Sequence, residues 1–245
     1  MSRLRVFPVV LALVLLSGCA NGGDTPASPE PDPTTASPTT STPTPTATSV
    51  GCAPTGDGVP EGAQVVTTID LDGDGSADQL WIADQGEART LGVTTGSGAT
   101  FTHPIDLAGP AGASAFALRP ADQSLVLLSD NRVADLLMVQ GCALVDVTDA
   151  EGQPWQFDLG FAGNGTGVGC VDLTGDGQLD LVGLNVLDPG ADPETVERTE
   201  ITLTGTVAAA GVGDQVSVPA TDTTAHAITC DDRTMDADGV HEASA

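Results

Sequence analysis

The sequence has 245 residues, of which 34 are acidic and 7 are basic, and its formal net charge is −27. A chain with this charge repels the phosphates of nucleic acids, which argues against nucleic-acid binding as its function. It contains 5 cysteines and no lysine, and beyond an N-terminal leader it is long enough for one proper core.

The first 18 residues read as a signal peptide. Arg3 and Arg5 precede an apolar run over 6–16 that is too short for a permanent membrane span. The run ends in Leu16-Ser-Gly-Cys19, which resembles the lipobox of bacterial lipoproteins. This resemblance implies that Cys19 receives a lipid with acyl chains such as palmitate and becomes the mature amino terminus. We therefore expect a bacterial protein anchored to the cell membrane by lipid and facing outward; ordinary secretion with an incidental cysteine is the alternative.

Residues 19–50 follow as a linker. Beyond Cys19 they are almost entirely Pro, Thr, Ser and Ala, with hardly an apolar side chain to bury. Such a composition predicts a disordered, extended stalk between the lipid and the folded part of the chain.

From residue 51 to 235 the sequence predicts an all-β domain. Short apolar or alternating runs are separated by Gly, Pro, Asp or Asn, and no window of helical period is long enough to rival them. The expected strands are 64–69, 79–83, 90–95, 115–118, 124–128, 136–139, 143–147, 167–171, 181–184, 199–207 and 226–230.

A loop between the first two expected strands has the spacing of a calcium site. It reads Asp70-Leu-Asp-Gly-Asp-Gly-Ser-Ala-Asp78. Calcium takes six to eight oxygen ligands, so a binding loop must turn back on itself and direct alternate side chains inward. Gly75 permits that turn. The expected ligands are the side chains of Asp70, Asp72, Asp74 and Asp78 and the main-chain carbonyl of Ser76.

A second copy of the loop lies between the strands expected at 167–171 and 181–184. It keeps three of the carboxylates and the glycine but has threonine at the third place, which predicts weaker binding. Its expected ligands are Asp172, Thr174, Asp176, Gln178 and Asp180. A third, degenerate copy over 129–135 has lost the glycine and most of the carboxylates, and should keep the hairpin without the metal.

These loops resemble those of the FG-GAP or VCBS repeats of integrin-type propellers, in which an Asp-x-Asp-x-Asp-Gly-x-x-Asp loop joins two strands of one blade and binds calcium. The resemblance covers residues 66–83 and 167–184, and it implies a small propeller-like domain of three to four blade-like units. A β-sandwich is the alternative architecture. The EF-hand is excluded, because its twelfth place requires glutamate and here holds Trp81 and Gly183. An acidic turn without metal remains the simplest competing interpretation of either loop.

Four cysteines remain once Cys19 is assigned to the lipid. An even number in an oxidising compartment predicts two disulfides, with three possible pairings. We favour Cys142 with Cys170, on the view that each lies in a short apolar strand, and Cys52 with Cys230, near the two ends of the domain.

Catalytic motifs are scarce. The histidines His103, His226 and His241 stand in no metal-binding or nucleophile pattern. Residues 236–245 read as a solvated acidic tail that includes His241. The sequence thus predicts a calcium-stabilised, non-enzymatic display domain that binds a protein or a glycan or supports the envelope. An envelope hydrolase with a spatially assembled site and a ligand-capture protein are the alternatives.

Overall fold

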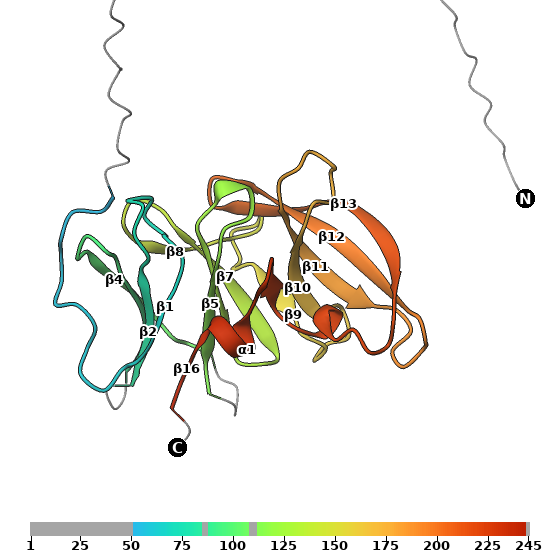
Figure 1. The fold of residues 1–245 in the computed structure, drawn as a ribbon, viewed down its shortest axis with the longest axis horizontal. Coiled ribbons are helices and arrows are strands. Elements are labelled where there is room, and N and C mark those ends of the chain that lie inside the picture. Colours follow the sequence, from blue (N-terminus) through green and yellow to red (C-terminus); the bar gives the residue numbers. More distant parts are fainter. Residues whose placement is uncertain (1–50, 85–87, 108–111, 244–245) are drawn as a thin grey trace, which may run out of the picture. The chain divides into compact units, whose positions relative to one another are not determined.

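The computed structural model describes residues 51–84, 88–107 and 112–243 (Figure 1). The signal peptide expected at 1–18, the lipidated Cys19 and the linker expected at 19–50 lie outside the described residues. The described chain is all-β, as the sequence predicts, with three larger antiparallel sheets and one short two-stranded sheet.

Sheet 1 is a meander of four consecutive strands, β1 (Gln64–Thr67), β2 (Gln79–Asp84), β3 (Arg89–Thr94) and β4 (Thr100–Pro104). The central strand β2 is buried on both faces. Its Trp81, 2% exposed, packs flat on Gly92 of β3, where a Cβ would lie 2.1 Å from the indole ring. Glycine is therefore required at position 92. Trp81 Nε1 donates a hydrogen bond to Thr94 Oγ1 at 3.1 Å, so this buried side chain anchors β2 to β3.

Sheet 2 contains β5 (Ser114–Leu118), β6 (Leu125–Ser129), β7 (Val133–Val139), β8 (Leu144–Asp146) and β9 (Gln156–Asp158), with the C-terminal β16 (Val240–His241) paired to β5. Every residue of β5 and β6 is buried. Strands buried on both faces need near-continuous apolar sequence, which explains the runs at 115–118 and 125–128. The degenerate third loop is a tight hairpin turn between β6 and β7, as expected.

Sheet 3 is a second four-stranded meander, β10 (Gly167–Val171), β11 (Asp180–Val186), β12 (Glu194–Thr204) and β13 (Val207–Val218). The single strand expected at 199–207 is wrong. The chain turns back at Gly205, whose φ of +61° suits a tight hairpin, so β12 ends before the turn and β13 begins after it. Strand β13 is rich in Ala and Gly, which have weak strand propensity, and its pattern is correspondingly faint.

The three sheets pack face to face, with sheet 2 in the middle (Figure 1). One core cluster joins sheet 1 to one face of sheet 2 through side chains such as Leu80, Leu91 and Leu137. The other face of sheet 2, including Phe116 and Leu127, packs against sheet 3. None of the described sheets closes on itself.

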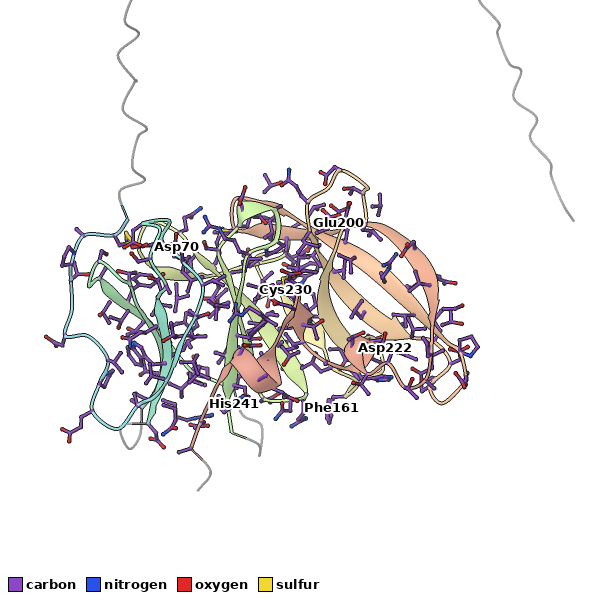
Figure 2. All side chains as sticks on the ribbon, viewed as in Figure 1. Asp70, Phe161, Glu200, Asp222, Cys230 and His241 are labelled. Carbon is purple, nitrogen blue, oxygen red and sulfur yellow. A yellow bond between two sulfur atoms is a disulfide. The ribbon has the colours of Figure 1, made fainter. Side chains whose placement is uncertain are left out.

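Both disulfides exist, but the favoured pairing is wrong. Cys52 bonds to Cys142 and Cys170 bonds to Cys230. Cys142 does not lie in a strand: it is in the turn between β7 and β8, with φ +61°, and its partner Cys52 lies beside Asp72 and Ser97 in the loops of sheet 1. Cys170 of β10 meets Cys230 of β14 (Thr229–Cys230) because a parallel bridge between Val168 and Ile228 aligns the two segments. Figure 2 shows Cys230 near the middle of the molecule.

The solvated acidic tail expected over 236–245 is wrong for residues 236–243, which are the part of it that the structure describes. After β14 and β15 (Arg233–Thr234), a single helical turn α1 (Met235–Asp238) leads into β16, where Val240 is 1% exposed. The Glu242 carboxylate forms a two-point ion pair with Arg89, at 2.7 Å to Nε and 2.6 Å to Nη2. The acidic composition of this segment hides a strand that completes sheet 2 and a contact with sheet 1.

Candidate metal centre

The first acidic loop joins β1 to β2 and is closed at its base by backbone hydrogen bonds. The Thr68 N–H donates to the Asp78 carbonyl at 2.7 Å, and the Asp78 N–H donates to the Ile69 carbonyl at 3.4 Å. Gly73 and Gly75 have φ of +78° and +88°, the left-handed region that favours glycine. Strands rather than helices flank the loop, which agrees with the exclusion of an EF-hand.

The loop brings three of its carboxylates together. Asp70, Asp72 and Asp78 each offer an oxygen atom, and these atoms lie within 4.8 Å of one another. The Asp70 oxygens accept the N–H groups of Gly73 at 2.7 Å and Gly75 at 2.9 Å. Backbone amides thus fix the orientation of this carboxylate at the end of sheet 1 (Figure 2).

Asp72 is held in the same way by two backbone amides. Its Oδ1 accepts the Asp74 N–H at 3.1 Å, and its Oδ2 accepts the Cys52 N–H at 2.7 Å. The second hydrogen bond connects the loop to Cys52, which is disulfide-bonded and precedes β1. The sequence of the loop does not predict this contact.

Asp78 is the most buried member of the cluster, at 0% exposure. Its Oδ2 accepts the Leu71 N–H at 2.7 Å and its Oδ1 accepts the Gly96 N–H at 2.9 Å. Burial raises the pKa of Asp78 above its ordinary value, and the negative charges of Asp72 and Asp70 raise it further. A cation among these groups would oppose both effects.

A fourth expected carboxylate of this loop stands outside the cluster. Asp74 is not among the three grouped carboxylates, and its Oδ1 accepts the Ser76 N–H at 2.6 Å. A positive group is also nearby: Arg119, which directly follows β5, donates to the Asp70 carbonyl at 2.9 Å, with its Nη1 3.9 Å from Asp70 Oδ2.

The donor set fits a hard cation. Carboxylate oxygens are the ligands that calcium prefers, and three of them converge on one point in a loop whose backbone is already fixed. Asp70, Asp72 and Asp78 would hold the ion in this arrangement. The start of the loop would then be cross-linked through the metal to Asp78, the residue that precedes β2.

The second loop has the same backbone turn. Gly175 and Gly177 have φ of +79° and +87°, and Asp172 accepts their N–H groups at 2.7 Å and 3.1 Å. Asp180 Oδ2 accepts the Leu173 N–H at 2.9 Å, as Asp78 does with Leu71 in the first loop. The repeat detected in the sequence is therefore also a repeat of hydrogen bonds.

Carboxylates do not converge in the second loop. Among the described residues, the only group of three acidic or other ligating side chains at metal-binding separation is the one in the first loop. Thr174 stands where Asp72 stands in the first loop, and it is exposed together with Asp172, Asp176 and Gln178. Only Asp180 is half-buried among these residues. The structure thus groups three carboxylates in the first loop and, among the described residues, no such set in the second.

A cleft of about 570 Å³ lies beside His103, where β4, β7 and β8 meet. The ring Nδ1 donates to the Pro104 carbonyl at 2.7 Å, and Nε2 lies 3.1 Å from Asp146 Oδ1. Burial, and then the charges of Asp146 and Asp130, raise the pKa of Asp135 in the same cleft. No Ser, Thr or Cys is among the described residues that line it, so His103 has no hydroxyl or thiol to activate there.

The remaining two histidines lie at other places in the fold. The sequence predicts that His226 lies in a strand at 226–230, and this is wrong. His226 ends a short 3₁₀ turn, and its Nε2 lies 3.3 Å from Glu194 Oε2. His241 Nδ1 lies 2.8 Å from Ser114 Oγ, a pair that no sequence motif marks. Ser114 is only 6% exposed and lines none of the clefts described here, so the pair stabilises the β5–β16 contact.

No helix in the described part of the chain is long and apolar enough to cross a membrane. Comparison of the chain with known protein families, curated proteins and solved structures found no match.

Proposed function

We propose that this chain is a lipid-anchored protein of the bacterial cell surface, whose β-repeat unit is stabilised by calcium and serves as a binding domain. The observation that carries the proposal is the convergence of Asp70, Asp72 and Asp78 within 4.8 Å on a strand-connecting loop. Calcium at about ten times its dissociation constant would add about 1.4 kcal/mol to the free energy of unfolding.

The two disulfides support an extracytoplasmic location, because such bonds persist in oxidising compartments. The lipobox-like segment ending in Cys19 supports attachment to the membrane by lipid. The charge of −27 disfavours nucleic acid as the partner, which leaves a protein or a glycan.

A propeller-like repeat unit of the FG-GAP or VCBS kind is the architecture that we propose. Its support is the matching hydrogen-bond pattern around Asp70 and Asp172, together with antiparallel sheets that pack face to face as propeller blades do. Each sheet would correspond to one blade, with an acidic loop between two strands of the first and the third.

Calorimetric titration of the mature protein with calcium tests the metal proposal, using Asp70→Asn and Asp172→Asn as a matched pair. We expect Asp70→Asn to lose the stronger binding event and Asp172→Asn to keep it. If the wild-type protein binds no calcium, and its thermal melting is the same in EGTA and in calcium chloride, the proposed metal role is wrong.

Lipid anchoring is tested separately with Cys19→Ala. Wild-type protein is expected in the membrane fraction and the variant in the soluble fraction. A variant that stays in the membrane fraction would show that something other than lipid at Cys19 holds the protein there.

A further inference from the structure

A second cleft, of about 480 Å³, lies between β9 and the face of sheet 3. This volume is within the range of about 300–1,000 Å³ that is usual for small-ligand sites. A neighbouring hollow of about 450 Å³ shares Glu197 and Thr199 with it and extends over β13. The residues that line the cleft are distant in sequence from the first acidic loop. Some of them lie in β10 and β11, the strands on either side of the second acidic loop.

The sheet face beneath the cleft is made of two cross-strand rows. Register pairs Gly183 with Thr199 and Asn185 with Glu197 between β11 and β12. On β13, Gly213 continues the first row and Gln215 the second. Side chains of directly paired residues lie on the same face of a sheet, so Thr199 has a glycine as its neighbour on each of the two adjacent strands.

Two aromatic side chains form the wall of the cleft. Trp155 and Phe157 are arranged edge to face, with ring centroids 6.4 Å apart and an interplanar angle of 74°. The Phe157 ring lies over Gly183, where a Cβ would be 3.7 Å from the ring. The Trp155 indole N–H is buried and has no hydrogen-bond acceptor among the described residues. A buried donor of this kind is an unusual cost in a folded protein.

The polar groups of the cleft are left free by the fold. The side chains of Asn185, Glu197 and Thr199 are half-buried, and we find no hydrogen bond from them to another described residue. Asp158 differs, since its oxygens accept the N–H groups of Ala162 at 2.9 Å and Asn164 at 2.7 Å. Burial alone would raise the pKa of Asp158, but these backbone hydrogen bonds hold it below its ordinary value. Asp158 therefore shapes the rim of the cleft, and Glu197 is the available acceptor.

Charge restricts the ligand further. No arginine or histidine is among the described residues that line the cleft, and the sequence has no lysine. An anionic ligand would meet uncompensated carboxylates. With Asp158 engaged by backbone amides and Asp214 paired with Arg198, one free carboxylate is a weak basis for binding a strongly cationic ligand.

The geometry points to a neutral oligosaccharide as the ligand of this cleft. A sugar ring presents C–H groups that pack on aromatic faces and hydroxyls that both donate and accept hydrogen bonds. Trp155, which is half-buried, supplies the first kind of contact beside the buried Phe157; Asn185, Thr199 and Glu197 supply the second. An extended peptide would instead use unpaired backbone groups along the outer edge of β13. This inference rests on the proposed binding role and names its ligand class, and it does not depend on calcium.

The test uses the full-length mature protein and an array of neutral oligosaccharides built from hexoses, pentoses and N-acetylhexosamines, with acidic oligosaccharides on the same array. The strongest neutral binder is then titrated calorimetrically, in EGTA and in calcium chloride. We expect saturable binding with a Kd of about 1 mM or tighter. No neutral binder, or preferential binding of the acidic sugars, overturns the inference.

Two variants locate the binding. Glu197→Gln should weaken it about tenfold, the loss expected for one hydrogen bond to a charged group. The matched control is Glu200→Gln on the same strand. Glu200, labelled in Figure 2, lies at the β-bulge and is not among the residues that line the cleft. Equal effects of the two substitutions would place the sugar elsewhere on the molecule.

Fluorescence gives a second readout, because the chain has only two tryptophans. In a Trp81→Phe variant the emission comes from Trp155 alone, and the bound sugar should change it with the calorimetric Kd. An unchanged emission with binding intact would remove Trp155 from the site. Loss of the calcium-dependent melting shift with sugar binding retained would contradict the metal proposal alone; the reverse outcome would contradict this inference alone.

Discussion

Replacing Asp78 by alanine removes the carboxylate that joins the first acidic loop to the rest of sheet 1. Its oxygens accept the N–H groups of Leu71 and Gly96, and the side chain is fully buried. Alanine leaves both donors without an acceptor, at about 1–3 kcal/mol each. The expected loss is therefore about 2–5 kcal/mol without calcium, or a fall in Tm of roughly 6–15 °C for a chain of this size.

Asparagine at position 78 separates the structural role of this side chain from its metal role. It keeps one oxygen to accept a hydrogen bond, and it removes a negative charge whose ionisation burial opposes. We expect Asp78→Asn to lose less than half as much stability as Asp78→Ala in EGTA. Both variants should lose the calcium-dependent increase in Tm, because a neutral amide is a poor substitute for the closing carboxylate.

The assay is thermal unfolding of the mature wild-type protein and both variants, followed by circular dichroism in EGTA and in saturating calcium chloride. If Asp78→Ala melts with the wild type in EGTA, the two buried hydrogen bonds do not hold the loop. If Asp78→Asn keeps the full calcium-dependent shift, Asp78 is not a ligand.

Three further predictions concern charge and cross-linking. Asp135→Asn should be more stable than the wild type at pH 7, because the raised pKa of Asp135 means that its ionisation opposes folding. The difference in the free energy of unfolding, measured with urea, should vanish as the pH falls below about 4. Equal differences at pH 7 and below about pH 4 would contradict this. Glu242→Gln has the opposite sign. Its ion pair with Arg89 lowers the pKa of Glu242, so the variant should be less stable by about 1–2 kcal/mol at pH 7 and equal to the wild type once acid has protonated the carboxyl; a loss that persists in acid would refute it. Replacing both Cys170 and Cys230 by alanine opens a cross-link between residues 60 apart, and should cost up to about 4 kcal/mol in chemical unfolding, whereas an unchanged midpoint would show that the bond does not constrain the unfolded chain.

Local features of this fold could be predicted from the sequence. The acidic loops are specified by carboxylates and glycines within nine residues, and the structure places both loops between adjacent antiparallel strands. Strand runs that are buried on both faces, such as 125–128, are also legible because nearly every side chain in them is apolar. These patterns can be recognised in the sequence without knowing how the sheets pack against one another.

Features that depend on packing between distant segments could not be predicted. The disulfide partner of Cys52 is decided by the position of the β7–β8 turn beside the acidic loop and the β3–β4 turn of sheet 1. The sequence around Glu242 predicts an acidic tail, because its ion-pair partner Arg89 lies 153 residues earlier in the chain. The cleft between β9 and sheet 3 has no sequence motif either. Its polar residues come from neighbouring strands, and its aromatic wall comes from β9 and the residue before it.

The disulfide of Cys52 also determines how the unit would carry a mechanical load. Tension applied to the chain ahead of Gly51 reaches Cys52 before it reaches β1, a four-residue strand at the edge of sheet 1. The covalent bond to Cys142 passes that tension directly to the β7–β8 turn of the central sheet. Strand β1 and the acidic loop that follows it are then spared from peeling. Under such tension the acidic loop would stay folded until the cross-link between Cys52 and Cys142 was reduced.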